Sequence, residues 1–402
     1  MKIILIKFII PHNNIAKKNP NKLQLSPSYL NLINNLWKQD GKKYFPPIEF
    51  RKKLANMNEL FKEGLPNDAK DLVTYILTQL HTELNLYDGK NTNMNSDIII
   101  NQFDENMVLN SFVNSFFNEN RSVLSDHFYG IQESKFICSG CQKRNMNSGK
   151  LPMKYNFQTF NFLIFPLEEV RIFKNNKNNM NMINQINMNQ MNNMNNMNNM
   201  NNMNIMNNIN NMNNMNNLNN MNNMNMFNQN MFNPMNQFNN NIFINNIILP
   251  NNNNVVNIYD CFDYWEKEEI FSGDNAMWCN ECKGLFPNKN QTLIYTGPNI
   301  LIIILNRGVG IQFNVKLDFY ETINLDKYII KKDKPSMIYD LYGVVTHLGE
   351  SGDGGHFVAS CKSPCNNSWY RYNDAMISPI TNINSEIINF GNSYILFYQK
   401  RK

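Results

Sequence analysis

The chain has 402 residues, a formal charge of +5 and 42% hydrophobic residues, which suffices for one large domain or two ordinary ones. Its Lys and Arg residues are not clustered, which argues against a nucleic-acid partner, and no apolar run reaches the ~18 residues of a membrane span. The segment Ile3–Ile10 is short, contains Lys7 and precedes no small-residue cleavage site, which argues against a secretory signal. We therefore expect a cytoplasmic or nuclear protein with reduced cysteines, whose paired spacings indicate metal before disulfides.

The first helices are expected soon after an ambiguous start. Residues 1–22 form an uncertain N-terminal remnant, in which Ile3–Ile10 fits either a buried strand or the apolar part of an incomplete element. Ser26 is a good N-cap residue and Pro27 suits the first helical position, so a helix should begin there. A pair of prolines then introduces a second helix over residues 46–55.

The clearest helical pattern covers Asp68–Asn85, where apolar residues recur as one continuous stripe. Asp68 and Asp71 stand at the N-cap and N3 positions of this helix. Carboxylates there accept backbone N–H groups and interact favourably with the positive end of the helix, and this capping role can coexist with a functional one. A further helix is expected over residues 104–117.

Two Cys-x-x-Cys turns, Cys138 with Cys141 and Cys279 with Cys282, have the spacing of a zinc site. Each turn places two thiolates at a distance suited to one tetrahedral zinc ion, and two such turns close a structural site. Four thiols without metal, or a redox pair, remain as alternatives. A zinc-ribbon nucleic-acid binder would share this motif, but the chain lacks the basic and aromatic surface that such a protein needs.

A low-complexity tract separates the two turns. No charged residue occurs from Asn178 to Tyr259, and Met-Asn-Asn repeats dominate. Because a three-residue period fits neither a strand nor a helical stripe, we expect a disordered insertion over residues 175–255, with self-association as an alternative role. Without it the turns are roughly 55 residues apart, separated by the strand-like Tyr155–Phe165 and the helix-like Ile258–Glu269, which predicts the two ends of a long β-finger.

Strands dominate the C-terminal part of the chain. Gly297–Arg307 is a continuous apolar run of strand length, which predicts a central strand buried on both faces. Further strands are expected over Tyr339–Thr346, His356–Cys361, Ser368–Asn373 and Ser393–Gln399. Helices early and strands late indicate an α+β domain.

Two of these strands can be paired from the turn between them. If the polar segment Lys362–Asn367 is a hairpin loop, His356 lies opposite Asn373 or Asp374, with side chains about 5 Å apart at Cβ. An acid at that distance could orient an imidazole base, although such a pair could also simply cap a hairpin.

Glycines precede the histidine of this hairpin. Gly354 and Gly355 leave room for a substrate backbone to approach closely, and they end a glycine-rich loop over residues 349–355. His347, before the loop, is expected to hold it by a hydrogen bond.

The combined motifs resemble the ubiquitin-specific protease (USP) family. They are Asn67–Asp71 opening a helix, the two cysteine turns, a buried strand ending in Leu305–Arg307, then Gly355–Phe357 and Trp369–Asp374. The resemblance covers residues 23–402 apart from the insertion. It implies a papain-like α+β fold with a helical thumb, an antiparallel β palm and zinc-bearing β fingers.

The resemblance also implies site residues and partners. His356 would be the general base and Asp374 its orienting acid, while Asp68 and Asp71 would contact the ubiquitin tail. The family more often has Gln where Asn67 stands and Glu where Asp71 stands. The expected partners are ubiquitin or ubiquitinated proteins, the expected cofactor is structural zinc, and the glycine-rich loop would lie beside the channel for the ubiquitin tail.

One family motif is not found in the sequence. The nucleophile of the family lies in an Asn-x-Gly-Asn-Thr-Cys-Tyr box, which would fall just before Met1. Cys361 follows His356 by five residues on one strand, so it faces the other way at about 16 Å. We therefore expect a USP-type deubiquitinase domain, incomplete at its N-terminus and inactive as given. A non-catalytic ubiquitin-binding module and a zinc-dependent scaffold with a self-associating tract are the alternatives.

Overall fold

The computed structural model describes residues 2–36, 45–87, 101–144, 152–185, 188, 255–331, 336–352 and 354–401. The chain divides into two compact units, residues 1–171 with 254–402 and residues 172–253. The first unit carries every residue that the sequence marks as functional. Among the described residues, no helix combines the length and the apolar character needed to cross a membrane.

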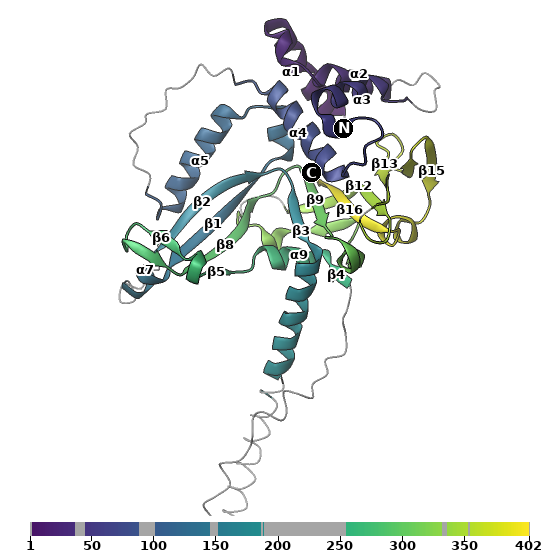
Figure 1. The fold of residues 1–402 in the computed structure, drawn as a ribbon. Helices are drawn as coiled ribbons and strands as arrows, with labels where there is room; N and C mark the ends of the chain where they lie inside the picture. Colours follow the sequence, from purple (N-terminus) through teal and green to yellow (C-terminus); the bar gives the residue numbers. More distant parts are fainter. Residues whose placement is uncertain are drawn as a thin grey trace, which may run out of the picture. The chain divides into compact units, whose positions relative to one another are not determined.

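Five helices of the first unit, the thumb helices, contribute to two buried hydrophobic clusters, and Figure 1 shows their arrangement. They are α1 (Lys2–Lys18), α2 (Ser26–Leu36), α3 (Ile48–Met57), α4 (Ala69–Leu84) and α6 (Val123–Phe128). Ile15 of α1 packs with Leu80 and Leu84 of α4 in one buried cluster. The strand alternative for Ile3–Ile10 is wrong, because these residues lie inside α1. A short apolar run cannot distinguish a strand from a helix that continues into polar sequence.

The capping of α2 also differs from the expectation. The hydroxyl of Ser26 has no hydrogen-bond partner among the described residues. Instead the carboxylate of Glu83, on α4 and 2% exposed, accepts the backbone N–H groups of Leu25 and Ser26 at 2.7 and 2.8 Å. A carboxylate at a helix N-terminus interacts favourably with the helix dipole, so α4 stabilises α2 from a distance in sequence.

The fingers are a four-stranded antiparallel sheet with the order β2-β1-β8-β5. Its strands are β1 (Gly130–Cys138), β2 (Met153–Phe160), β5 (Glu269–Phe271) and β8 (Asn288–Thr296). Helix α5 (Glu105–Glu119) packs on β2 through Phe112, whose ring stacks 6.4 Å from that of Phe157. A separate two-stranded sheet joins β6 (Met277–Cys279) to β7 (Gly284–Phe286), and the short helix α7 (Ser139–Arg144) follows β1.

The palm is the largest sheet, with the order β15-β14-β13-β12-β16-β9-β3 and β11 paired to β12. Its strands are β3 (Leu163–Pro166), β9 (Ile300–Asn306), β11 (Thr322–Asn324), β12 (Ile338–Leu348), β13 (His356–Lys362), β14 (Trp369–Asn373), β15 (Met376–Ile380) and β16 (Asn392–Lys400). All pairs are antiparallel except β3 with β9. The expected strand Tyr155–Phe165 is therefore two strands, β2 and β3, which lie in different sheets.

Strand β9 is the buried central strand that the sequence predicts. Alternate residues face opposite sides of the sheet, so Ile302 packs on the side of α4 and Leu301 on the side of α9 (Ile258–Trp265). The palm is thus covered by helices on both faces. A short parallel pair, β4 (Val255–Asn257) with β10 (Lys316–Asp318), lies beside α9.

The expected insertion, residues 175–255, begins inside a helix that covers residues 167–185, and its last residue belongs to β4. Residues 186, 187 and 189–254 lie outside the described residues. Their expected disorder therefore stays a prediction.

Candidate functional site

The hairpin of β13 and β14 differs by one or two residues from the two registers that the sequence predicts. Lys362 pairs with Trp369 and Cys361 with Tyr370, so the loop covers residues 363–368. Hydrogen bonds between the ends of the loop close it, and Asn367 supplies a left-handed backbone with a φ of 58°. Asn tolerates this conformation better than most residues, which explains the later start of β14.

The candidate base is hydrogen-bonded to Asn373, the last residue of β14. Nε2 of His356 lies 2.6 Å from Oδ1 of Asn373, whereas the nearest oxygen of Asp374 is 3.7 Å away. Asp374 begins the turn to β15 with a φ of 50°, and its side chain is 82% exposed. The expected strand pairing left both residues as neighbours of His356, and the family resemblance implied the orienting role for Asp374. The hydrogen-bond geometry favours Asn373 in that position.

This hydrogen bond selects one tautomer of the neutral imidazole. Because an amide oxygen can only accept, Nε2 of His356 carries the hydrogen and donates it to Asn373. Nδ1 then keeps its lone pair and can accept a proton from a neighbouring thiol. The carboxylate of Asp374 is close enough to interact with the imidazolium that would form.

The glycine-rich loop before His356 lies against the ring of His347. A Cβ on Gly355 would come within 2.6 Å of the carbonyl oxygen of Leu348 and would overlap His347, whereas a Cβ on Gly354 would meet nothing within 4 Å. Burial and the nearby Arg307 lower the pKa of His347, so its ring is neutral. Gly355 is therefore required by packing, and Gly354 lines open space.

The loop is held differently from the expectation. Nδ1 of His347 has no hydrogen-bond partner among the described residues, and its ring packs instead 4.9 Å from the rings of Phe313 and Phe357. Three hydrogen bonds fix the loop from outside. They run from Gly310 N–H to Ser351 O, from Asn314 Nδ2 to Glu350 O and from Asn392 Nδ2 to Gly349 O, at 2.9, 3.0 and 3.2 Å.

The two candidate substrate-binding acids begin helix α4, as the sequence predicts. Asp68 is the N-cap residue, and its Oδ1 accepts the backbone N–H of Lys70 at 2.8 Å. Its Oδ2 accepts a hydrogen bond from the hydroxyl of Tyr394 at 2.6 Å. Asp71 stands two residues after the first residue of α4 and is exposed. Asp68 therefore connects α4 to the palm through Tyr394. Asp71 lies in the first turn of α4, with its side chain exposed.

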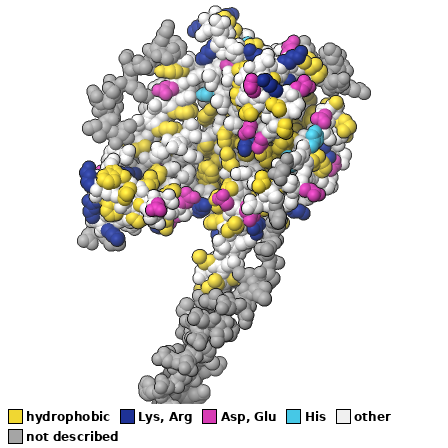
Figure 2. All heavy atoms as spheres, in the orientation of Figure 1, with side chains coloured by type: hydrophobic (Ala, Val, Ile, Leu, Met, Phe, Trp, Pro, Cys, Tyr) yellow, Lys and Arg dark blue, Asp and Glu magenta, His cyan; other side chains and the backbone are white. Residues whose placement is uncertain are grey.

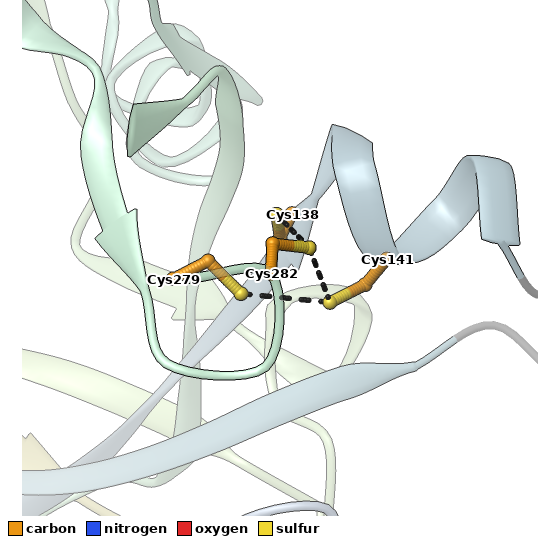
Figure 3. A group of neighbouring side chains, drawn as sticks. All are labelled: Cys138, Cys141, Cys279 and Cys282. Carbon is orange, nitrogen blue, oxygen red and sulfur yellow. Dashed lines mark hydrogen bonds between the residues drawn. The ribbon is translucent and has the colours of Figure 1, made fainter. Parts of the chain in front are cut away.

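The four candidate metal ligands come together at the end of the fingers (Figure 3). The sulfur atoms of Cys138, Cys141, Cys279 and Cys282 all lie within 4.8 Å of one another. Three of the pairs are 3.4, 3.5 and 3.8 Å apart. Four thiolates bound to one zinc ion at about 2.3 Å would have sulfurs about 3.8 Å apart, so the residues fit a tetrahedral ion.

The surroundings of the cluster support a packed structural site. A Cβ on Gly140 would come 2.9 Å from Sγ of Cys282, so the turn can close only with glycine there. Burial raises the pKa of Cys138 and Cys141, and it acts the same way on Cys279. Backbone N–H groups and neighbouring thiols outweigh burial at Cys279 and lower its pKa to about 7.

The outer surface of this end of the fingers is apolar. Trp278 and Leu285 are cross-strand neighbours on β6 and β7 and are 61% and 65% exposed. Figure 2 shows hydrophobic side chains gathered at this end beside Lys and Arg.

The other three cysteines lie away from the base. Cys261 is buried in α9, and Cys365 is exposed in the loop of the β13–β14 hairpin. Cys361 lies on β13, on the opposite face from His356, and burial raises its pKa to about 11. All seven cysteines are among the described residues, and no hydrogen bond joins any of them to His356.

Comparison with known proteins identifies the family. The sequence profile described as ubiquitin carboxyl-terminal hydrolase matches residues 5–398. The chain belongs to the ubiquitin carboxyl-terminal hydrolase family. Ubiquitin carboxyl-terminal hydrolase 12 of Saccharomyces cerevisiae is 33% identical over 155 residues, and ubiquitin carboxyl-terminal hydrolase 21 of Homo sapiens is 30% identical over 150 residues. Each match covers 36% of this chain. The matched part is 12% of the length of the yeast relative and 25% of the length of the human relative.

Solved structures of this hydrolase family share the fold. A SAGA DUB module that contains Ubp8 and is bound to monoubiquitin matches with a TM-score of 0.54 at 17% identity, covering 97% of this chain and 62% of that chain. A related module bound to ubiquitin aldehyde matches with a TM-score of 0.52 at 17% identity, over 99% and 66% of the two chains. The predicted α+β fold of the USP type, with thumb, palm and fingers, is confirmed.

Proposed function

We propose that this ubiquitin carboxyl-terminal hydrolase chain carries the base and the ubiquitin-tail site of a deubiquitinase, which hydrolyses the bond after the C-terminus of ubiquitin. The hydrogen bond of 2.6 Å between His356 and Asn373 carries the proposal, because it leaves Nδ1 of a half-exposed imidazole free as a base. The setting supports it, since this pair lies beside a glycine-rich loop in the family fold.

The proposed reaction needs a thiol beside Nδ1 of His356. The imidazole takes the thiol proton, and the thiolate attacks the carbonyl carbon of the scissile bond. The imidazolium then protonates the leaving amine as the carbon–nitrogen bond breaks and a thioester forms. Water, deprotonated by His356, hydrolyses the thioester and restores the thiol. Asn373 keeps the ring oriented, and the carboxylate of Asp374 lowers the energy of the imidazolium.

The nucleophile does not come from the seven cysteines of this chain. Four belong to the cluster in the fingers, and the other three lie in α9, on the far face of β13 and in the hairpin loop. We therefore propose that residues 1–402 alone bind ubiquitin without cleaving it. An intracellular compartment, cytoplasm or nucleus, suits both a reactive thiol and a reduced cysteine cluster.

The ubiquitin tail would approach His356 between α4 and the glycine-rich loop. Asp68 and Asp71 present carboxylates at the start of α4, and Gly354 and Gly355 offer backbone without side chains. The contact of Asp68 with the palm supports its proposed role in binding the tail, and the open space around Gly354 supports the role of that glycine.

Zinc is the ion that we propose for the cysteine cluster. Four sulfur ligands suit zinc in a closed structural site, and the spacing of the sulfurs supports a tetrahedral arrangement. Bound there, the ion would join the end of β1 to the β6–β7 hairpin and stiffen the fingers.

The test uses ubiquitin that carries a fluorogenic amide at its C-terminus. Residues 1–402 should release no fluorophore, while the chain extended by a fused segment that carries the family's Asn-x-Gly-Asn-Thr-Cys-Tyr box should hydrolyse the substrate. In the extended chain, His356→Ala should lower the rate by about 10² to 10⁴, the usual worth of a general base, and Cys365→Ser should leave it unchanged. Hydrolysis that survives His356→Ala would contradict the proposed mechanism.

A non-catalytic ubiquitin-binding module is the second candidate. It is favoured by one observation, that none of the seven cysteines is bonded to His356. The same assay decides between the two, because an extended chain that binds ubiquitin without hydrolysis would select the binding module. A covalent adduct between residues 1–402 and a ubiquitin bearing a C-terminal electrophile would contradict both accounts.

A further inference from the structure

Tyr394 connects the start of α4 to the palm. It lies on β16, and its hydroxyl donates a hydrogen bond to Oδ2 of Asp68 at 2.6 Å, although the two residues are 326 positions apart in sequence. Burial and the neighbouring Asp68 raise the pKa of Tyr394, so the hydroxyl keeps its hydrogen at neutral pH. A phenol donating to a carboxylate is a charge-assisted bond, which is stronger than one between neutral groups.

Both oxygens of the Asp68 carboxylate are thereby committed. Oδ1 accepts the backbone N–H of Lys70, as an N-cap residue does, and this bond exists whether or not the palm is present. Oδ2 faces the hydroxyl of Tyr394, with Nζ of Lys70 at 3.4 Å. The N-cap bond alone would leave the carboxylate free to tilt, so Tyr394 is the group that sets its direction relative to the sheet.

The same ring also contacts the strand of the candidate base. The ring centroid of Tyr394 lies 5.2 Å from that of Phe357, the residue after His356. Phe357 in turn packs 4.9 Å from His347 beneath the glycine-rich loop. One side chain therefore touches the acid that begins α4 and the residue adjacent to the base.

We propose that Tyr394 is a positioning residue, which aligns the ubiquitin tail held at Asp68 with the base His356. This rests on the proposed function, and it adds a residue that acts through Asp68 and Phe357 without itself reacting. Loss of the Tyr394 hydroxyl should leave the packing of its ring on Phe357 in place. Only the carboxylate of Asp68 should lose a hydrogen bond.

The experiment measures the contribution of the ubiquitin tail to binding. Residues 1–402 and the variant Tyr394→Phe are titrated with intact ubiquitin and with ubiquitin that lacks its C-terminal tail, and the ratio of the two affinities is compared. The ratio should fall by about fivefold to tenfold in Tyr394→Phe, as expected for loss of one charge-assisted hydrogen bond. Affinity for the tailless ubiquitin should not change.

A double-mutant cycle separates positioning from a general structural effect. Asp68→Ala should reduce the same ratio, and adding Tyr394→Phe to it should cause no further loss, because the tyrosine acts through the acid. The matched control is Tyr398→Phe on the same strand, which removes a hydroxyl that donates to the carbonyl of Tyr320 at 2.7 Å. Its tail ratio should equal that of the wild type.

The outcomes distinguish this inference from the proposed function. A tail ratio that is unchanged in Tyr394→Phe, or losses that add in the double variant, would overturn the positioning role while ubiquitin binding stands. A wild-type chain that does not bind ubiquitin would overturn both. Thermal melting checks the fold of Tyr394→Phe. If that variant does not fold, Asp68→Ala decides, because it breaks the same bond from the other side and an unchanged ratio would then refute the inference.

Discussion

Nε2 of His356 lies 2.6 Å from Oδ1 of Asn373, at the end of the hairpin where β13 and β14 separate. This bond selects one tautomer of the imidazole, with the hydrogen on Nε2 and the lone pair on Nδ1. The carboxylate of Asp374, at 3.7 Å and mostly exposed, is too distant to make this selection.

Asn373→Ala should therefore allow both tautomers of His356 to be populated, while Asp374→Ala should leave the tautomer population nearly unchanged. Long-range ¹H–¹⁵N correlation spectra distinguish the two tautomers at neutral pH. The wild type should show the Nε2–H form, and Asn373→Ala a mixture of the two forms. A mixture in Asp374→Ala together with a single form in Asn373→Ala would restore the orienting role to the acid.

The two glycines before His356 should differ sharply in their tolerance of a side chain. Gly355→Ala places a methyl group against the carbonyl of Leu348 and the ring of His347, so the loop must move and the melting temperature should fall. Gly354→Ala meets open space and serves as the matched control, with a melting temperature close to that of the wild type. Equal effects of the two substitutions would mean that the loop has a different conformation in solution.

The cysteine cluster should bind about one zinc ion per chain, which elemental analysis of the purified protein measures. Cys141→Ser removes a buried ligand and should lose most of the metal, because three sulfurs cannot close the site. Cys365→Ser changes an exposed cysteine outside the cluster, and this variant should keep its zinc. Zinc far below one per chain in the wild type, or full zinc in Cys141→Ser, would exclude this assignment.

The stability of the thumb should depend on pH through His81. Nδ1 of His81 lies 2.7 Å from Oγ of Ser122, the N-cap residue of α6, and burial lowers the pKa of the imidazole. Because the folded pKa lies below the unfolded value, the unfolded chain binds more protons at low pH. Stability is therefore fully present above the unfolded pKa of about 6.5 and is lost as the pH falls from there through the lower folded pKa.

Melting temperatures at about pH 7.5 and about pH 5.5 check this prediction. The decrease on acidification should be smaller in His81→Gln than in the wild type, because the variant has no group to protonate at that position. An identical decrease in both proteins would place the acid sensitivity elsewhere.

Local chemistry made parts of the fold predictable. Asp68 caps α4 as its position in the sequence indicates, a helix forms near residues 104–117 as expected, and the apolar run of β9 forms a strand buried on both faces. The cysteine turns were also predictable, because the ligand spacing of a zinc site depends on few residues. Each of these features is decided within a short segment.

Long-range contacts decided the features that sequence reasoning missed. Glu83, not Ser26, satisfies the first N–H groups of α2, which no local pattern indicates. The register of the β13–β14 hairpin depends on the left-handed backbone at Asn367, and it places Tyr370 opposite Cys361 in place of the expected Ser368 or Trp369. A closer inspection of the loop could have found this, since Asn is the residue that most readily adopts that conformation. The role of Tyr394 required the structure, because its partner is 326 residues away.

Titration of residues 1–402 with ubiquitin, followed by calorimetry, measures whether the chain binds ubiquitin through its C-terminal tail. We expect saturable binding of one ubiquitin per chain, in about the micromolar range and weaker by about tenfold when ubiquitin lacks its C-terminal tail. Absence of binding at about millimolar ubiquitin, or binding that is indifferent to the tail, would contradict a ubiquitin-tail site beside His356.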